Sequence, residues 1–179
     1  MEERTSSGVR KLDAATTAAR SFLGLLLLTS GDRAAVVSFN AQANLEVPLT
    51  SAQGVLSAAL GRLTTGLLTC LPCGVEAGAA ELEAKQRSGA MSVLVLLTDG
   101  RSNPRPVSEA VDRATAAKAA GVTIFTIALG RDVDEAALRE MASYSAAFLA
   151  VSDADALEAS FATIALSLPC QPDSFWGRR

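Results

Sequence analysis

One apolar segment near the middle of the chain places the strongest limit on its fold. Residues 92–98 read Ser-Val-Leu-Val-Leu-Leu-Thr, and Asp99 and Gly100 follow directly. A run of consecutive apolar residues is typical of a strand buried on both faces, as in a parallel sheet covered by helices. Ligands and ions bind beyond the carboxyl ends of the strands in such sheets. Asp99 is therefore the first candidate for a functional residue.

The remaining segments alternate between helical and extended patterns. Apolar spacing predicts helices at 11–29, 55–63, 72–85, 107–120, 132–143 and 157–168, and strands at 34–39, 44–47, 122–129 and 147–151. Thr50 or Ser51 is the expected N-cap of the second helix, and Asp132 with Glu135 is expected to cap the fifth. This alternation predicts a doubly wound α/β fold, with a mostly parallel sheet, one antiparallel edge strand and helices on both faces.

The composition bounds the number of domains and the classes of partner. A chain of 179 residues with 49% hydrophobic residues can form one domain, expected at 11–168 between an N-terminal tail at 1–10 and a flexible C-terminal tail at 169–179. The net charge is −3 and the basic residues are scattered, so no nucleic-acid partner is expected. The most apolar stretch, 22–28, is too short to span a membrane. Because the first residues lack a signal-peptide pattern, a cytoplasmic location is the default expectation, unless the chain derives from a longer secreted or surface protein.

The absence of histidine limits the catalytic mechanisms open to this chain. The chain has no histidine, which removes Ser-His-Asp and Cys-His mechanisms and histidine-ligated metals, so we expect a non-enzymatic protein. Cys70-Leu71-Pro72-Cys73 has the spacing of a redox dithiol at a helix N-terminus, which leaves thiol-disulfide exchange as an alternative activity. A structural pair or two inert thiols is the simpler interpretation. With Cys170 the thiols number only three, too few for a structural zinc site.

Three segments together resemble the von Willebrand factor A domain family. They are Asp32 to Asn40, Val93 to Arg101 and Ala120 to Gly130, which agree with the family in residue type, order and spacing. The resemblance covers roughly Lys11 to Leu168. It implies the Rossmann-like fold of that family and an adhesion-type role in protein–protein interaction.

The resemblance also implies a metal-ion-dependent adhesion site. In the family, an Asp-x-Ser-x-Ser loop, a threonine from a second loop and an aspartate from a third hold Mg2+ or Mn2+, and an acidic side chain of a partner protein completes the coordination. Such oxygen ligands suit a hard divalent cation. Asp99 matches the third-loop aspartate and Thr69 the second-loop threonine, with Thr65 as an alternative register.

The first loop of that site is degenerate in this chain. In the family it follows the first, central strand and precedes a helix that resembles Lys11 to Ala15, yet only ten residues precede Lys11. We therefore expect the first central strand to be missing. The segment Glu-Arg-Thr-Ser-Ser at 3–7 would offer Thr5 and Ser7 as hydroxyl ligands, although ordering a free tail costs about 1–2 kcal/mol per residue. A metal-free structural or assembly domain, a remnant of the fold, is the alternative function.

Overall fold

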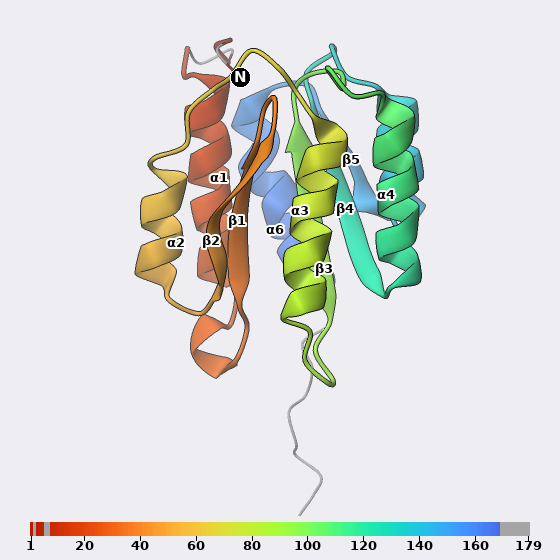
Figure 1. The fold of residues 1–179 in the computed structure, drawn as a ribbon. Coiled ribbons are helices and arrows are strands. Elements are labelled where there is room, and N and C mark those ends of the chain that lie inside the picture. The colour runs from red at the N-terminus through yellow and green to blue at the C-terminus, as the bar shows by residue number, and fades with distance from the viewer. Residues whose placement is uncertain (2, 6–7, 169–179) are drawn as a thin grey trace, which may run out of the picture.

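The strands occupy the middle layer of the molecule and helices cover both of its faces (Figure 1). The computed structural model describes residues 1, 3–5 and 8–168. Within these residues the strands are β1 (Ala34–Phe39), β2 (Ala43–Thr50), β3 (Ser92–Thr98), β4 (Val122–Leu129) and β5 (Phe148–Val151). The helices are α1 (Lys11–Leu25), α2 (Gln53–Leu60), α3 (Leu71–Ala84), α4 (Val107–Ala119), α5 (Glu135–Met141) and α6 (Leu157–Ser167).

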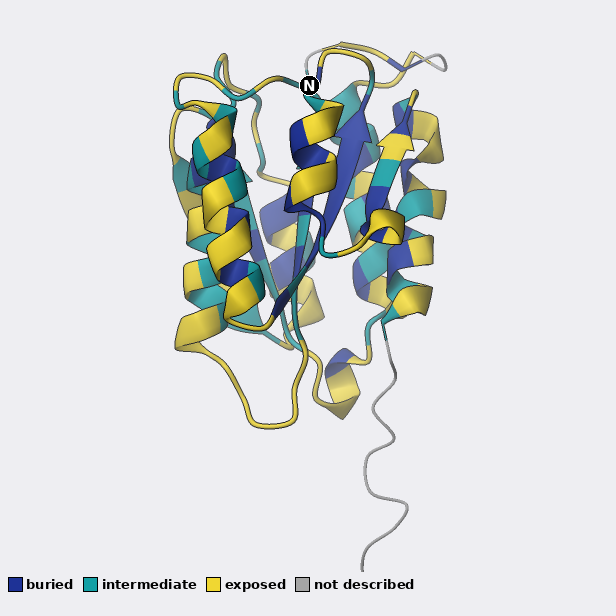
Figure 2. Ribbon diagram, turned by 90° about the vertical axis from the view of Figure 1, so that its right-hand side faces the viewer, coloured by how far each residue is buried: buried dark blue, intermediate teal, exposed yellow. Residues whose placement is uncertain are grey.

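This arrangement confirms the α/β fold expected from the sequence. In the view of Figure 1, α3 lies in front of the strands and packs against α4, while α1 and α6 pack against each other behind them. The side view in Figure 2 shows buried strands between helices whose outer faces are exposed. The bounds of β1 and β4 agree with the predicted strands at 34–39 and 122–129. None of the described helices is both long and apolar enough to span a membrane.

The predicted helix caps were wrong in detail. The carboxylate of Asp134, and not that of Asp132, accepts a hydrogen bond from the Ala137 amide at 3.1 Å, because α5 begins at Glu135 and its first free amides lie over Asp134. The Thr50 hydroxyl accepts from the Ala52 amide at 3.1 Å, which lies ahead of α2. The N-cap of α2 is Ala52, without a side-chain hydrogen bond, so none of Thr50, Ser51 and Asp132 caps the helix assigned to it.

The hydrogen-bonded sheet is divided in two. β1 pairs with β2 in antiparallel fashion, and β3, β4 and β5 form a parallel sheet in that order. Among the described residues, no strand pairs with the second edge of β1 or of β3. Few Cα atoms of β1 and β3 come within 8 Å of one another, whereas paired strands lie about 4.8 Å apart. The division falls where the missing central strand was expected, and we call it the split.

The hydrophobic core is divided along with the sheet. The larger cluster joins β3, β4 and β5 to α3, α4, α5, α6 and one face of α1. The smaller cluster joins the end of α1 to β1, β2 and α2, through Leu23, Leu28, Val36, Val47, Leu56, Ala59 and Leu60. Each half-sheet therefore has its own set of buried side chains.

Helix α3 spans the two halves. It packs against β1 and β2 of one half-sheet and against β3 of the other half-sheet. Two glycines permit this close approach: a Cβ atom at Gly74 would lie 2.8 Å from Cδ1 of Phe39 in β1, and one at Gly78 would lie 2.8 Å from Cδ1 of Leu94 in β3. Because these glycines lie one helical turn apart, α3 contacts both half-sheets with the same face.

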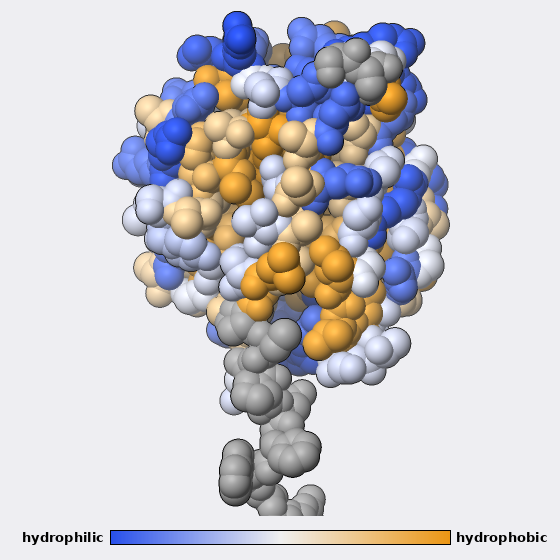
Figure 3. Space-filling model, turned by 180° about the vertical axis from the view of Figure 1, so that it is seen from behind, coloured by the Kyte–Doolittle hydropathy of each residue, from blue (hydrophilic) through white to orange (hydrophobic). Residues whose placement is uncertain are grey.

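Apolar side chains gather on the face formed by α1 and α6. Seen from behind, this face carries a hydrophobic area near the end of α6 (Figure 3). The exposed members include Leu25 and Leu27 at the end of α1 and Leu166 in the last turn of α6, with exposures of 52%, 54% and 85%. This surface lies at the amino edge of the sheet, opposite the edge that carries Asp99.

Candidate functional site

The loop at 66–70 joins the carboxyl ends of both half-sheets. The Cys70 amide donates to the carbonyl of Asn40, the residue after β1, at 2.6 Å. Thr69 forms an isolated antiparallel bridge with Asn103, in which each amide donates to the other carbonyl at 2.9 Å. Since Asn103 belongs to the loop after β3, this short loop closes the split at the edge where the predicted site lies.

Thr69 and the Asp99 loop come together at this edge. A Cβ atom at Gly100 would lie 3.1 Å from the Thr69 hydroxyl oxygen, so the hydroxyl lies directly against the backbone that follows Asp99. Thr98, which is 2% exposed, shapes the turn because its hydroxyl oxygen accepts from the Gly100 amide at 3.3 Å. The structure thus brings the hydroxyl of Thr69 against the third loop.

The Asp99 carboxylate has a cationic partner. Its Oδ2 atom lies 2.6 Å from the amino nitrogen of Met1, and the two groups are 16% and 19% exposed. Met1 also packs against the larger core cluster. The position beside the Asp99 carboxylate is therefore occupied by a positively charged group, the Met1 amine.

The described part of the predicted first loop is hydrogen-bonded to the residues just ahead of α1. The Thr5 amide donates to the Val9 carbonyl at 2.7 Å, and the Lys11 amide donates to the Glu3 carbonyl at 2.9 Å, so the segment turns back on itself ahead of α1. The Thr5 hydroxyl accepts from the Val9 amide at 3.1 Å and Thr5 is 9% exposed. Ser7 lies outside the described residues.

Glu3, the acidic position of the degenerate loop, is engaged elsewhere. Its Oε2 atom lies 2.5 Å from the Lys11 ammonium nitrogen. The hydrogen bond from Lys11, followed by the attraction of its charge, lowers the pKa of Glu3 below its ordinary value. Glu3 is thus an ion-pair partner of Lys11 on α1 in this structure.

Two side chains at this edge are suitable ligands for a cation that binds oxygen atoms. Asp99 supplies a carboxylate and Thr69 a hydroxyl, both hard ligands of the kind that Mg2+ and Mn2+ accept, and the Met1 ammonium stands where a cation would contact Asp99. Among residues 1, 3–5 and 8–168, no three His, Cys, Asp or Glu side chains cluster as a metal site would require. Further ligands would therefore have to be hydroxyls, backbone groups or water.

Sequence reasoning missed the arginine that anchors the third loop. Arg105 donates from Nε and Nη2 to the Glu109 carboxylate at 2.8 and 2.5 Å, and its Nη1 lies 3.5 Å from Glu76 on α3. The hydrogen bond to Glu109 is the main cause that raises the pKa of Arg105 above its usual range. The four-residue spacing of Arg105 and Glu109 at the start of a helix was the available signal.

A disulfide lies directly beside Thr69. Cys70 and Cys73 are bonded to each other at the start of α3, with Cα atoms 5.3 Å apart. Cys70 is fully buried, and Cys73 lies 3.8 Å from Nη1 of Arg105. This bond favours the interpretation of Cys70 and Cys73 as a structural pair.

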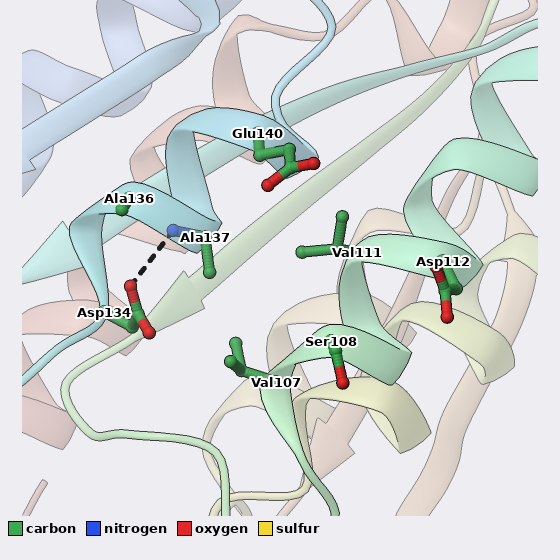
Figure 4. Close-up of a pocket in the computed structure, with 8 residues that line it drawn as sticks. All are labelled: Val107, Ser108, Val111, Asp112, Asp134, Ala136, Ala137 and Glu140. Carbon is green, nitrogen blue, oxygen red and sulfur yellow. Dashed lines mark hydrogen bonds between the residues drawn. The ribbon is translucent and has the colours of Figure 1, made fainter.

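A separate pocket lies between α4 and α5. It has a volume of about 410 Å³ and is lined by Val107, Ser108, Val111, Asp112, Asp134, Ala136, Ala137 and Glu140. Figure 4 shows valine side chains of α4 facing the start of α5, with the Asp134 carboxylate directed to the Ala137 amide. The cap thus engages one of the acidic groups of the pocket, and neither Asp99 nor Thr69 lines it.

The layered α/β fold, with polar loops converging at the carboxyl edge of its sheet, defines a Rossmann-like domain. The family model for the von Willebrand factor type A domain matches residues 5–163, and the chain belongs to this family. A search of curated proteins found no match.

Several solved structures share the fold at low sequence identity. One structure of proximal thread matrix protein 1 from the mussel byssus is 17% identical, with a TM-score of 0.78, over 87% of this chain and 42% of that one. A second, described with a zinc-occupied MIDAS motif, is 22% identical with a TM-score of 0.75 and covers 86% and 39%. The vWF domain of the type V pilus tip protein Mfa5 from Porphyromonas gingivalis is 15% identical, with a TM-score of 0.76, over 87% of both chains. This chain spans about two fifths of the length of the mussel proteins.

Proposed function

We propose that this chain is a non-enzymatic protein-binding module of the adhesion type, which binds its partner at the carboxyl edge of the sheet. The observation that carries the proposal is the convergence at this edge of Thr69, from the loop before α3, with Asp99 and Asn103, from the loop after β3. Membership of the von Willebrand factor A family supports it. The mussel thread matrix protein and the pilus tip protein, which share the fold, are consistent with such a role.

We further propose that binding depends on Mg2+ or Mn2+. Asp99 and Thr69 would hold the ion, with the hydroxyls of Thr5 and Ser7 as further ligands. When bound, the ion supplies an open coordination position for an acidic side chain of the partner protein. Asn103 positions Thr69 through its backbone bridge, and the Met1 amine has to leave Asp99 before a metal can bind there.

A thermal-unfolding titration with MgCl2 and MnCl2 tests the metal proposal. At a metal concentration 100 times the Kd, binding to the folded state contributes about 2.7 kcal/mol, which corresponds to a rise in Tm of about 5–10 °C. Asp99→Ala should abolish this rise. Asp112→Ala, which removes an exposed aspartate from the middle of α4, is the matched control and should retain it. An unchanged Tm for the unsubstituted chain would refute metal binding.

A displayed peptide library tests the binding edge itself. Peptides selected on the immobilised domain in Mg2+ should be enriched in acidic residues, and EDTA or Asp99→Ala should release them. Asn103→Pro removes an amide that donates to Thr69 and should weaken the same peptides without touching Asp99. If peptides bind both substituted domains as tightly as the unsubstituted one, the binding surface lies elsewhere and the proposal is overturned.

A metal-free binding or assembly module is the second candidate. The Met1 amine at 2.6 Å from Asp99 favours it, because this contact neutralises the carboxylate without a metal. This candidate predicts that library peptides remain bound in EDTA and that MgCl2 leaves the Tm unchanged. The two candidates thus give opposite results in the same pair of assays.

Thiol-disulfide exchange is the least supported alternative. Exchange requires a thiolate to reach a sulfur atom of the disulfide; Cys70 is fully buried, so attack would have to occur at the half-buried Cys73. An insulin-reduction assay decides the question, since a redox protein would lose turnover on Cys73→Ser. We expect no turnover from either form.

A further inference from the structure

We propose that residues 169–179 of this chain dock on the hydrophobic area at the ends of α1 and α6 (Figure 3), where Phe175 and Trp176 cover its exposed leucines. We call this area the leucine patch, and its members are Leu25, Leu27 and Leu166. The segment 169–179, expected from the sequence to be a flexible tail, lies outside the described residues. The proposal does not depend on metal or partner binding at Asp99, which lies at the opposite edge of the sheet.

The leucine patch contains side chains of α1 that the core does not take up. Residues 22–28 read Phe-Leu-Gly-Leu-Leu-Leu-Leu, and the smaller core cluster includes Leu23 and Leu28. Leu25 and Leu27 lie between these two residues in the chain and remain more than half exposed. Burial of such side chains is favourable because their apolar surface leaves water. The patch therefore offers a surface on which a further apolar group would be stabilised.

The end of α6 supplies the third leucine and the point of attachment. α1 and α6 pack side by side, with the ring centroids of Phe22 and Phe161 5.6 Å apart. Leu166 lies beyond Phe161, in the last turn of α6, and is 85% exposed. Leu168, two residues later, leaves the helix with extended backbone angles (φ −73°, ψ 125°) and packs against the larger core cluster. The segment that follows Leu168 therefore starts beside the leucine patch.

The segment that starts there carries apolar groups suited to the patch. Residues 169–179 read Pro-Cys-Gln-Pro-Asp-Ser-Phe-Trp-Gly-Arg-Arg, so two large aromatic residues stand together in a mainly polar stretch. Aromatic side chains bury about 150–250 Å² each. Six residues separate Leu168 from Phe175 and can span about 20 Å, whereas packed helices lie about 8–10 Å apart. The aromatic pair can thus reach the ends of both helices without any change in the described fold.

The area of the patch favours this segment over a second copy of the chain. At 25 cal/mol per Å², the transfer free energy of a leucine side chain corresponds to about 60–120 Å² of apolar surface. Three leucines therefore supply well below the surface of about 800 Å² that each partner of a stable dimer buries. The segment 169–179 needs no such area, because attachment through a short linker gives it an effective concentration in the millimolar range.

Tryptophan fluorescence tests the proposal, because Trp176 is the only tryptophan of the chain. Acrylamide quenching of the folded, full chain separates a protected component, the docked segment, from an accessible one. We expect the protected component to dominate and its emission to lie at shorter wavelength than that of the urea-unfolded chain. Leu166→Ser should lower the ratio of docked to free segment about tenfold, the effect of one lost leucine contact. Leu67→Ser, at an exposed leucine in the loop at 66–70 on the opposite edge, is the matched control and should leave the ratio unchanged.

The contrary results would overturn the proposal. If Trp176 is quenched in the folded chain as readily as in the unfolded chain, the segment does not dock. If Trp176 is protected but neither Leu166→Ser nor Leu25→Ser makes it accessible, the segment packs elsewhere. If protection rises with protein concentration and the chain sediments as a dimer, a second copy covers the patch. Leu25→Ser lies on α1, so it keeps the test decisive if Leu166→Ser disturbs α6 in the circular-dichroism spectrum.

Discussion

Reduction of the Cys70–Cys73 disulfide gives the most direct prediction of a magnitude. The bond closes a short loop, with a sequence separation of 3, at the start of α3. For a loop of this size, the chain-entropy relation gives a loss of about 2 kcal/mol in the free energy of unfolding when the bond is opened. The loss arises mainly in the unfolded chain, which regains conformations that the bond had excluded.

Urea unfolding with and without a reductant measures this loss. For an m-value of about 2 kcal/mol/M, a change of about 2 kcal/mol moves the urea midpoint down by about 1 M. Cys73→Ala, which cannot form the bond, should have the lower midpoint and should not respond to reductant. Cys170→Ala should behave like the unsubstituted chain, because its thiol takes no part in the bond.

The first two of the following results would refute this reasoning, and the third would change its cause. Equal midpoints with and without reductant would show that the bond does not form or does not constrain the unfolded chain. A response of Cys73→Ala to reductant would show that the effect comes from another thiol. A loss well above about 4 kcal/mol would indicate that the native start of α3 itself depends on the bond.

Other substitutions test separate parts of the structure. Thr126→Val should lower the free energy of unfolding by only about 1 kcal/mol in a urea titration, because Thr126 is buried and donates at 2.9 Å to the Leu138 carbonyl, which keeps a second donor. Gly24→Ala should raise it by about 0.5–1 kcal/mol, since a Cβ atom there has open space and α1 gains a better helix former; a decrease would contradict this. Glu3 should stabilise the fold above its ordinary pKa of 4.5 and lose this contribution as the pH falls through its lowered folded pKa, and Lys11→Ala should remove the effect in pH-dependent melting.

The sequence predicted those elements that depend on local pattern. The strand at 122–129 was predicted with correct bounds because a continuous apolar run ends at Gly130, whose φ of +83° suits glycine. The division of the sheet was expected from the short segment before Lys11 together with the family's strand order. The cap at Asp134 was missed because Asp132 and Asp134 both precede the helix, and only the actual first turn distinguishes them.

The candidate site was predictable only in part. Asp99 follows a buried strand, so its place at the sheet edge follows from spacing alone. The contact of Asp99 with Met1 and the bridge between Thr69 and Asn103 join residues far apart in the chain, and no periodicity encodes such pairs. The turn formed by Thr5 is likewise a local hydrogen-bond pattern that composition does not reveal.

The division of the core has a consequence for the order in which the protein folds. The smaller cluster is built from one continuous stretch of chain, 23–60, whereas the larger one combines residues from 15 to 164. Contacts between residues close in sequence form fast, because closing a short loop costs little entropy. During synthesis the smaller cluster can therefore form before α3 and the parallel strands have emerged from the ribosome. It would provide a surface on which the later half of the chain assembles.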